Sequence, residues 1–165
     1  MSRTNEQPRL DYVQQSPELV KKLRDFSMAI ANSGHIEPVL GHLVDIRASQ
    51  MNGCAFCLDM HVKEAKLHGE RELRLHHVAI WRESPLFTPK ERAALALTEA
   101  LTKIATTGVS DELYAEVREQ FSEKELSTLI FRVVGINAWN RVNVACRTTP
   151  GARDQALGLD KAGLA

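Results

Sequence analysis

Residues 47–61 of the chain read RASQMNGCAFCLDMH and hold Cys54, Cys57 and, four residues later, His61. The Asn52-Gly53 pair is a strong chain-reversal signal, so a helix is expected to begin at the first cysteine. On that helix, offsets of three and seven residues bring the two cysteines and the histidine onto one face. This stretch therefore predicts a helix that presents two sulfur atoms and an imidazole together.

Two thiols that can close a disulfide beside an imidazole are the parts of a thiol redox centre. A helix N-terminus favours negative charge, which lowers the pKa of a thiol and supplies the reactive thiolate. Two other interpretations stay open: two core cysteines beside a polar histidine, or a structural zinc site built on a Cys-x-x-Cys half-site. A closed zinc site would use His61 and a fourth ligand from His42, His68, His76, His77 or Cys146. No second paired cluster exists, so the redox interpretation is preferred and no metal is expected.

Two polar residues lie on the apolar helix predicted just before the cysteines, over residues 36–51. His42 lies at the edge of the apolar stripe and is either a boundary histidine with one hydrogen bond or a neighbour of the dithiol. Arg47 projects to the middle of the stripe, where an unpaired charge would be costly. We expect Arg47 to pair with Glu91 or Glu99.

Helical spacing and capping signals extend over nearly the whole chain and predict an all-α fold of about six or seven helices. The predicted helices cover residues 17–34, 36–51, 54–69, 70–81, 88–107, 111–120 and 122–142. Thr88–Glu91 and Ser122–Glu125 are capping boxes. The last helix is apolar round most of its circumference, and its Asn137, Trp139, Asn140 and Arg141 are expected to fix helix register or line a pocket. Residues 148–165 lose periodicity and are expected to form a tail of low order.

Composition is that of one ordinary globular domain over residues 1–165, with an ordered core at about 16–147. The 21 basic and 21 acidic residues cancel, which argues against binding to nucleic acids or membrane surfaces through bulk charge. No apolar run approaches the roughly 20 residues of a membrane helix. The polar N-terminus and the odd number of cysteines, three, indicate a reducing cytoplasm. Zero net charge makes association through an apolar face easy, so a homo-oligomer is expected.

The stretch at 47–61 resembles the core of the carboxymuconolactone decarboxylase superfamily, in its alkylhydroperoxidase D-like branch. Three further segments share the likeness: WRESPLF at 81–87, ERAALALTEALT at 91–102 and INAWNR at 136–141. The resemblance covers roughly residues 16–147. It implies a compact helical bundle that assembles into trimers or hexamers and a peroxidase that uses a Cys-x-x-Cys pair without a cofactor.

In enzymes of that branch the second cysteine attacks the hydroperoxide and the first resolves the sulfenic acid, which assigns these roles to Cys57 and Cys54. The resemblance also implies that His61 takes part in proton transfer and that a lipoyl-bearing protein or another thiol donor reduces the disulfide. Decarboxylase members lack the cysteine pair, so decarboxylation is not expected.

Two residues depart from the pattern. A glutamate usually stands twelve residues before the first cysteine, where this chain has His42, and the best-studied relay has a histidine where this chain has Phe56. His42 is therefore a candidate auxiliary base. The alternative functions are a thiol–disulfide oxidoreductase or redox sensor without peroxidase turnover, and a non-enzymatic helical protein held by zinc.

Overall fold

The computed structural model describes residues 7–106 and 108–164, and in that part the chain forms helices and no strands. The α-helices are α1 (Tyr12–Gln15), α2 (Pro17–Asn32), α3 (Pro38–Asn52), α4 (Ala55–Leu67), α5 (Glu72–His77), α6 (Pro89–Thr102), α7 (Asp111–Gln120), α8 (Glu123–Cys146) and α9 (Asp154–Leu157). Two short 3-10 helices are η1 (Val78–Ile80) and η2 (Leu159–Ala162). The predicted all-α class is confirmed.

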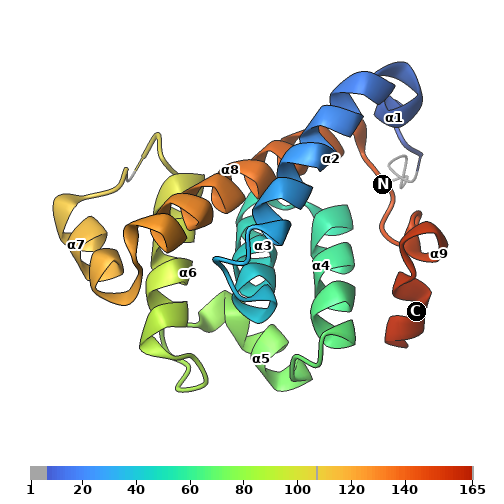
Figure 1. Ribbon diagram of the computed structural model, residues 1–165. Helices are drawn as coiled ribbons and strands as arrows, with labels where there is room; N and C mark the ends of the chain where they lie inside the picture. The colour runs from blue at the N-terminus through green and yellow to red at the C-terminus, as the bar shows by residue number, and fades with distance from the viewer. Residues whose placement is uncertain (1–6, 107, 165) are drawn as a thin grey trace.

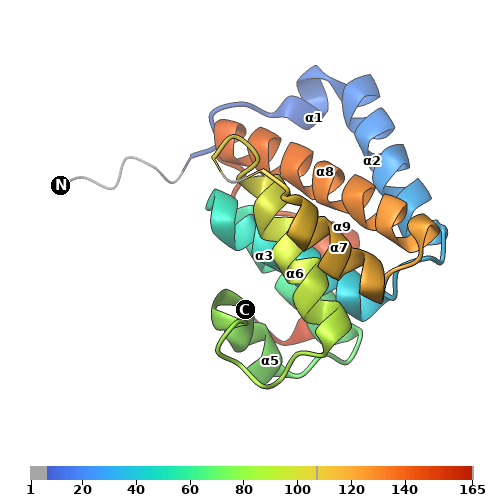
Figure 2. The same ribbon diagram turned by 90° about the vertical axis from the view of Figure 1, so that its left-hand side faces the viewer.

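Helix α3 lies at the centre of the bundle and packs against α4, α6 and α8 (Figure 1). Helix α2 packs on α8 and α1 packs on α2, while α5 lies at the opposite end of the molecule (Figure 2). One core cluster joins α3, α6, α7 and α8 through Val44, Leu97, Val117, Leu129 and Val133. A second joins α3 to α4, α5 and α6. The central helix thus contributes to both cores, and its remaining surface is available for a site.

The chain begins and ends its main helices at the signals expected from the sequence. Thr88 and Ser122 close capping boxes with Glu91 and Glu125, and each box satisfies two backbone N–H groups. Gly53 ends α3 with a φ of 65°, a left-handed conformation that glycine adopts without strain. The turn at Gly53 leads directly into α4.

The structure differs from the sequence predictions in several details. The helix expected over 88–107 ends at Thr102, and Thr107 lies outside the described residues. The helix expected over 70–81 is shorter, with α5 followed by η1. Helix α1 was not predicted; Asp11 caps it by accepting hydrogen bonds from the backbone of Val13 and Gln14. With α1 and α9, the described residues hold nine α-helices rather than six or seven.

The tail predicted at 148–165 is wrong in a way that matters for the site. Residues of α9 and η2 pack on α4, and Leu159 and Ala162 are buried. Lys63 on α4 forms ion pairs with Asp59 and Asp154 at 2.9 and 2.6 Å. These elements are too short to show helical periodicity, and their order comes from contacts with a helix about 90 residues earlier in the chain.

Within residues 7–106 and 108–164, the search for a helix with the length and hydropathy of a membrane span finds none.

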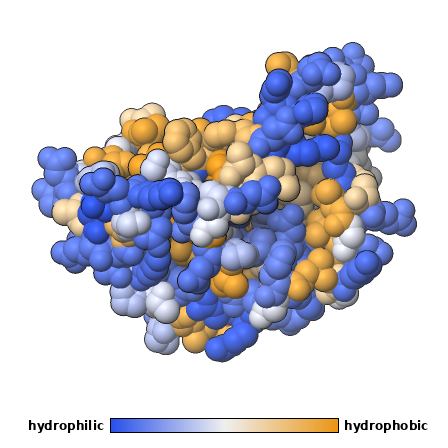
Figure 3. All heavy atoms as spheres, in the orientation of Figure 1, coloured by the Kyte–Doolittle hydropathy of each residue, from blue (hydrophilic) through white to orange (hydrophobic). Residues whose placement is uncertain are grey.

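The outer face of α8 is apolar and exposed. Apolar side chains gather along the upper edge of the face shown in Figure 3, over α8. Phe131 and Val134 of that helix are 52% and 51% exposed. The outer face of α8 is therefore an apolar surface that the single chain does not cover.

Candidate active site

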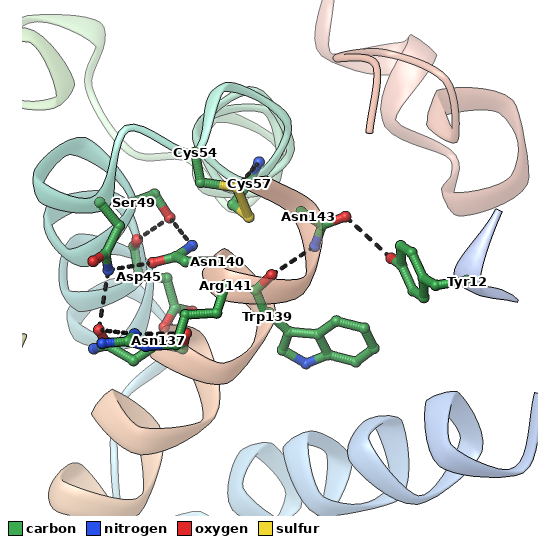
Figure 4. Close-up of a disulfide and its surroundings, with 11 residues drawn as sticks. Tyr12, Asp45, Ser49, Cys54, Cys57, Asn137, Trp139, Asn140, Arg141 and Asn143 are labelled. Carbon is green, nitrogen blue, oxygen red and sulfur yellow. Dashed lines mark hydrogen bonds between the residues drawn. A yellow bond between two sulfur atoms is a disulfide. The ribbon is translucent and has the colours of Figure 1, made fainter. Parts of the chain in front are cut away.

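The two cysteines lie at the start of α4 and are joined by a disulfide (Figure 4). Cys54 is the N-cap of the helix, and its Sγ accepts a hydrogen bond from the backbone N–H of Cys57 at 3.2 Å. Their Cα atoms are 5.3 Å apart, within the 4.4–6.8 Å that disulfides usually span. Both residues are almost fully buried. The turn at Gly53 and the first turn of α4 therefore hold the pair in bonding position.

A network of buried amides holds the turn before the cysteines against α8. The Nδ2 atom of Asn52 donates to Asn137 at 3.0 Å and to Asn140 at 2.9 Å, while Asn140 donates to the hydroxyl of Ser49. Asn140 has no exposed surface. These bonds connect α3 and α8 beside the disulfide (Figure 4). The amides of α8 fix helix register, as the sequence predicted.

A cavity of about 410 Å³ reaches Cys57, and Cys54 is not among the residues that line it. The walls come mainly from α2, α3, α4 and α8, and their apolar side chains include Ile30, Phe56, Met60, Ile136 and Trp139. Arg153 and Leu157 of the C-terminal segment also line it. His42 and His61 face the same cavity. Of the four residues singled out from the sequence, three line this cavity, and Cys54 lies behind Cys57.

His61 is held by two carboxylates that the sequence analysis did not identify. Its Nδ1 lies 2.8 Å from Glu64 Oε2 and 3.7 Å from Asp45 Oδ2. Burial disfavours the charged imidazole, but Asp45 and the hydrogen bond to Glu64 outweigh burial and raise the pKa of His61. The pKa of Glu64 is lowered: burial acts against this shift, and the contact with His61 overcomes it. His61 is thus a histidine that its neighbours favour in the protonated form.

His42 is buried and lines the same cavity, with its Nδ1 atom 3.9 Å from Glu64 Oε2. Its Nε2 is 3.0 Å from His68 Nδ1, and the two rings stack with centroids 4.9 Å apart. Burial lowers the pKa of His42 to about 4, so the ring is neutral near neutral pH. Both interpretations of His42 offered from the sequence therefore apply: it has one hydrogen-bond contact, with His68, and it lines the cavity that reaches Cys57.

Asp45 is oriented by Arg132, a residue of α8 that the sequence analysis did not single out. The guanidinium bonds both carboxylate oxygens, at 3.2 and 2.6 Å, and also the carbonyl of Gly41. A Cβ atom at position 41 would overlap this guanidinium, so a larger residue there would displace Arg132 from its place on Asp45. A sequence signal for the acidic residues did exist: His42 and Asp45 on α3, and His61 and Glu64 on α4, each lie three residues apart on one helix face.

Arg47 pairs with a carboxylate, as predicted, and the partner is Glu99 at 2.7 Å. The other predicted candidate, Glu91, pairs instead with Arg74. Glu99 also accepts a hydrogen bond from the indole of Trp81. None of these residues lines the cavity at Cys57, so this network supports the fold and not the site.

In the disulfide form seen in this structure, the two sulfur atoms are bonded to each other and are not free to bind zinc as thiolates. A different group of potential ligands lies close by. The donor atoms of His42, Asp45 and His61 all lie within 4.8 Å of one another in the described part of the chain. Any ion held beside the disulfide would therefore have nitrogen and oxygen ligands.

Comparison with known proteins gives consistent results. Residues 17–100 match the carboxymuconolactone decarboxylase family. The uncharacterized protein YdfG of Bacillus subtilis (strain 168) is 40% identical over 137 residues, which are 83% of this chain and 92% of YdfG. A solved structure from Agrobacterium tumefaciens, of unknown function and described as a candidate antioxidant defence protein AhpD, is 39% identical. Its TM-score is 0.86, over 88% of this chain and 99% of that one.

The debrominase Bmp8 shares the fold at a TM-score of 0.77 and 21% identity, over 91% of this chain and 80% of that chain. This likeness concerns the fold alone. The family match and the Agrobacterium structure agree with the Cys-x-x-Cys motif at the start of α4 and with the all-helical bundle around it. The chain is therefore a member of the carboxymuconolactone decarboxylase family, in its AhpD-like branch.

Proposed function

We propose that the protein is a thiol-dependent peroxidase that reduces organic hydroperoxides through a cycle of Cys54 and Cys57. The observation that carries the proposal is the cavity: it gives a small molecule access to Cys57 and His61 together, while Cys54 lies behind Cys57 within disulfide reach. A nucleophile, a proton donor and a resolving thiol are the three groups that this chemistry needs.

The cycle begins with the reduced pair. The Cys57 thiolate attacks the outer oxygen of the hydroperoxide, the O–O bond breaks, and the alcohol leaves with a proton that His61 donates. The product on Cys57 is a sulfenic acid. The Cys54 thiol then attacks that sulfur, the S–S bond forms, and water leaves. A dithiol donor, of the lipoyl type or another thiol protein, reduces the disulfide and returns two hydrogens to the pair.

Two features support this assignment of roles. The start of α4 places both sulfur atoms in the positive end of the helix dipole, which stabilises a thiolate. Glu64 and Asp45 supply carboxylates to His61 in a chain that has His42 where the family usually has glutamate. The mainly apolar cavity suits an organic hydroperoxide better than hydrogen peroxide, since apolar walls reward burial of an alkyl group.

The decisive experiment counts free thiols before and after one equivalent of an organic hydroperoxide is added to the reduced protein. A Cys146→Ser background removes the third thiol from the count. We expect both remaining thiols to be lost while one equivalent of alcohol appears, and repeated turnover when dihydrolipoamide is supplied. Thiols that survive the peroxide would refute the peroxidase. Oxidation without repeated turnover would favour the redox sensor.

A further inference from the structure

One buried nitrogen atom at the cavity has no hydrogen-bond partner among the described residues. The Nδ1 atom of His42 is inaccessible and forms no hydrogen bond with any described residue, in a side chain that is only 7% exposed overall. The other ring nitrogen is used in the contact with His68. An unsatisfied buried polar atom costs about 1–3 kcal/mol, so proteins seldom keep one unless an ion, a water molecule or a reaction makes use of it.

The groups around this nitrogen are all able to bind a metal. His42 Nδ1 lies 3.9 Å from Glu64 Oε2, which in turn lies 2.8 Å from His61 Nδ1. His61 Nδ1 is 3.7 Å from Asp45 Oδ2. Tetrahedral coordination with bonds near 2.1 Å would place donor atoms about 3.4 Å apart. The contacts of 3.7 and 3.9 Å are close to that value, and the donor atoms of His42, Asp45 and His61 all lie within 4.8 Å of one another. Glu64 is outside that group of three, so its carboxylate would have to turn toward Asp45 to bind the same ion.

The pattern comes from two neighbouring helices. Helix α3 contributes His42 and Asp45, and α4 contributes His61 and Glu64, so each helix presents a histidine and a carboxylate three residues apart. Residues at this spacing point to the same side of a helix. We propose that these four side chains bind a divalent first-row transition ion such as Zn²⁺.

The chemistry of the donors selects this class of ion. Two imidazoles and two carboxylates are typical zinc ligands, whereas Mg²⁺ and Ca²⁺ prefer oxygen alone. Among the described residues, Arg132 places a guanidinium in contact with the cluster, against the two carboxylates. Once His61 gives up the proton that it shares with Glu64, an incoming cation would meet one net negative charge.

The surroundings meet two further requirements of a metal site. Arg132 fixes the orientation of Asp45 from outside the cluster, which is how metal-binding carboxylates are usually held. All four side chains line the cavity that reaches Cys57, so an ion has a route of entry. The ligand set is distinct from the cysteine-based zinc site considered from the sequence, and it places a metal where the sequence analysis expected none.

Metal binding can be tested without peroxide, so its result is separate from that of the proposed peroxidase. The oxidised full-length protein, freed of metal with a chelator that is then removed, would be titrated with Zn²⁺ by calorimetry and with Co²⁺ by visible absorption. We expect one ion per chain and the absorption bands of Co²⁺ bound to nitrogen. His42→Ala should weaken binding by more than about 100-fold, because it removes a ligand. Mutation of residues that only hydrogen-bond to metal ligands already lowers metal affinity by about 10–100-fold.

His76→Ala is the matched control, because His76 is exposed and distant in the fold on α5. It should bind the ion like the parent protein. Glu64→Gln gives a second test at a less buried position if His42→Ala fails to fold, and circular dichroism would monitor both. Affinity unchanged in His42→Ala and Glu64→Gln would overturn the proposal. So would binding that requires reduced protein and disappears in the Cys54→Ser/Cys57→Ser variant, because the ion would then be on the thiols.

Discussion

Cys54 and Cys57 lie one helical turn apart and yet have different surroundings. Cys54 packs in a small apolar cluster with Ala48, Phe56 and Ile136, whereas Cys57 also faces the cavity. The helix terminus favours Cys54 as the thiolate, because Cys54 is the N-cap and its sulfur accepts the N–H of Cys57. Access of a substrate from the cavity favours Cys57 as the attacking thiolate. Since general acid catalysis contributes about 10²–10⁴-fold, the cysteine that shares a cavity with His61 should be the nucleophile.

Single substitutions separate these two roles. Cys57→Ser should abolish reaction with the hydroperoxide, whereas Cys54→Ser should react once and leave a stable sulfenic acid on Cys57. A dimedone-type reagent followed by mass spectrometry of the peptides locates that group. A label on Cys54 in the Cys57→Ser protein, with none on Cys57 in Cys54→Ser, would show that the helix terminus outweighs access and that the roles are reversed.

The sequence predicted only the part of this site that is local in the chain. Cys54, Cys57 and His61 are within one helix, so their spacing was enough to place them on one face. Arg132 was not identified because its partner, Asp45, is 87 residues away, and nothing in either segment alone indicates the pair. Whether His42 lies near the cysteines was left open for the same reason, because tertiary packing brings Glu64 and His68 to it from a later part of the chain.

At the scale of helices, the capping box of α8 predicts a dependence of stability on pH. Glu125 accepts hydrogen bonds from Lys90 and from both the N–H and the hydroxyl of Ser122. The contact with Lys90, followed by those with Ser122, lowers the pKa of Glu125 from 4.5 to about 2. A lowered pKa contributes stability above the unfolded value, and this stability is lost as the pH falls toward the folded value.

Comparison with Glu125→Gln would isolate the charge, because glutamine retains the capping geometry. We expect the parent to exceed the variant in unfolding free energy by about 0.5–1 kcal/mol near pH 7, a typical value for a charge at a helix terminus. The difference should shrink as the pH falls from about 4.5 toward 2, measured by urea unfolding. Glu116→Gln, at an exposed position in the middle of α7, is the control. A difference that stays constant across this pH range would contradict the assignment.

The amide network between α3 and α8 predicts a second effect on stability. Asn140→Leu keeps the volume similar but removes the acceptor for Asn52 and the donor to Ser49. Each of these two hydrogen bonds is worth about 0.5–1.5 kcal/mol, so their loss should lower the urea midpoint without changing the slope. Asn32→Leu, at the exposed end of α2, should change stability by less than about 0.5 kcal/mol. Equal midpoints for the two variants would show that the network adds nothing.

Helices that carry their own start and stop signals were predicted well, and those that depend on distant contacts were not. α6 and α8 begin at capping boxes that can be read from four residues. α9 and η2 have no side-chain cap and are held by burial against α4 and by the ion pair of Lys63 with Asp154. Local chemistry therefore decides the first group, and the second becomes ordered only when the bundle is complete.

At the scale of the whole molecule, the exposed apolar face of α8 leads us to expect a homo-oligomer, a trimer or hexamer as the family resemblance implies. Phe131 and Val134 are about half exposed on a helix whose other side is fully buried. Val134→Glu should shift the assembly toward monomer in light scattering at micromolar concentration. Lys124→Glu, also exposed on α8, changes charge without removing apolar surface and should leave it intact. A parent protein that scatters as an 18.4 kDa monomer would contradict this expectation.

The packing of the C-terminal segment also limits how the protein can be immobilised or fused to another domain. Ala162 is buried three residues before the last position of the sequence, and the same segment contributes Arg153 and Leu157 to the cavity wall. A fusion partner or surface that displaced η2 would expose Ala162 and uncover α4 beside the cavity. An electrode or bead that is meant to report the reaction is therefore better attached to a part of the chain away from this segment.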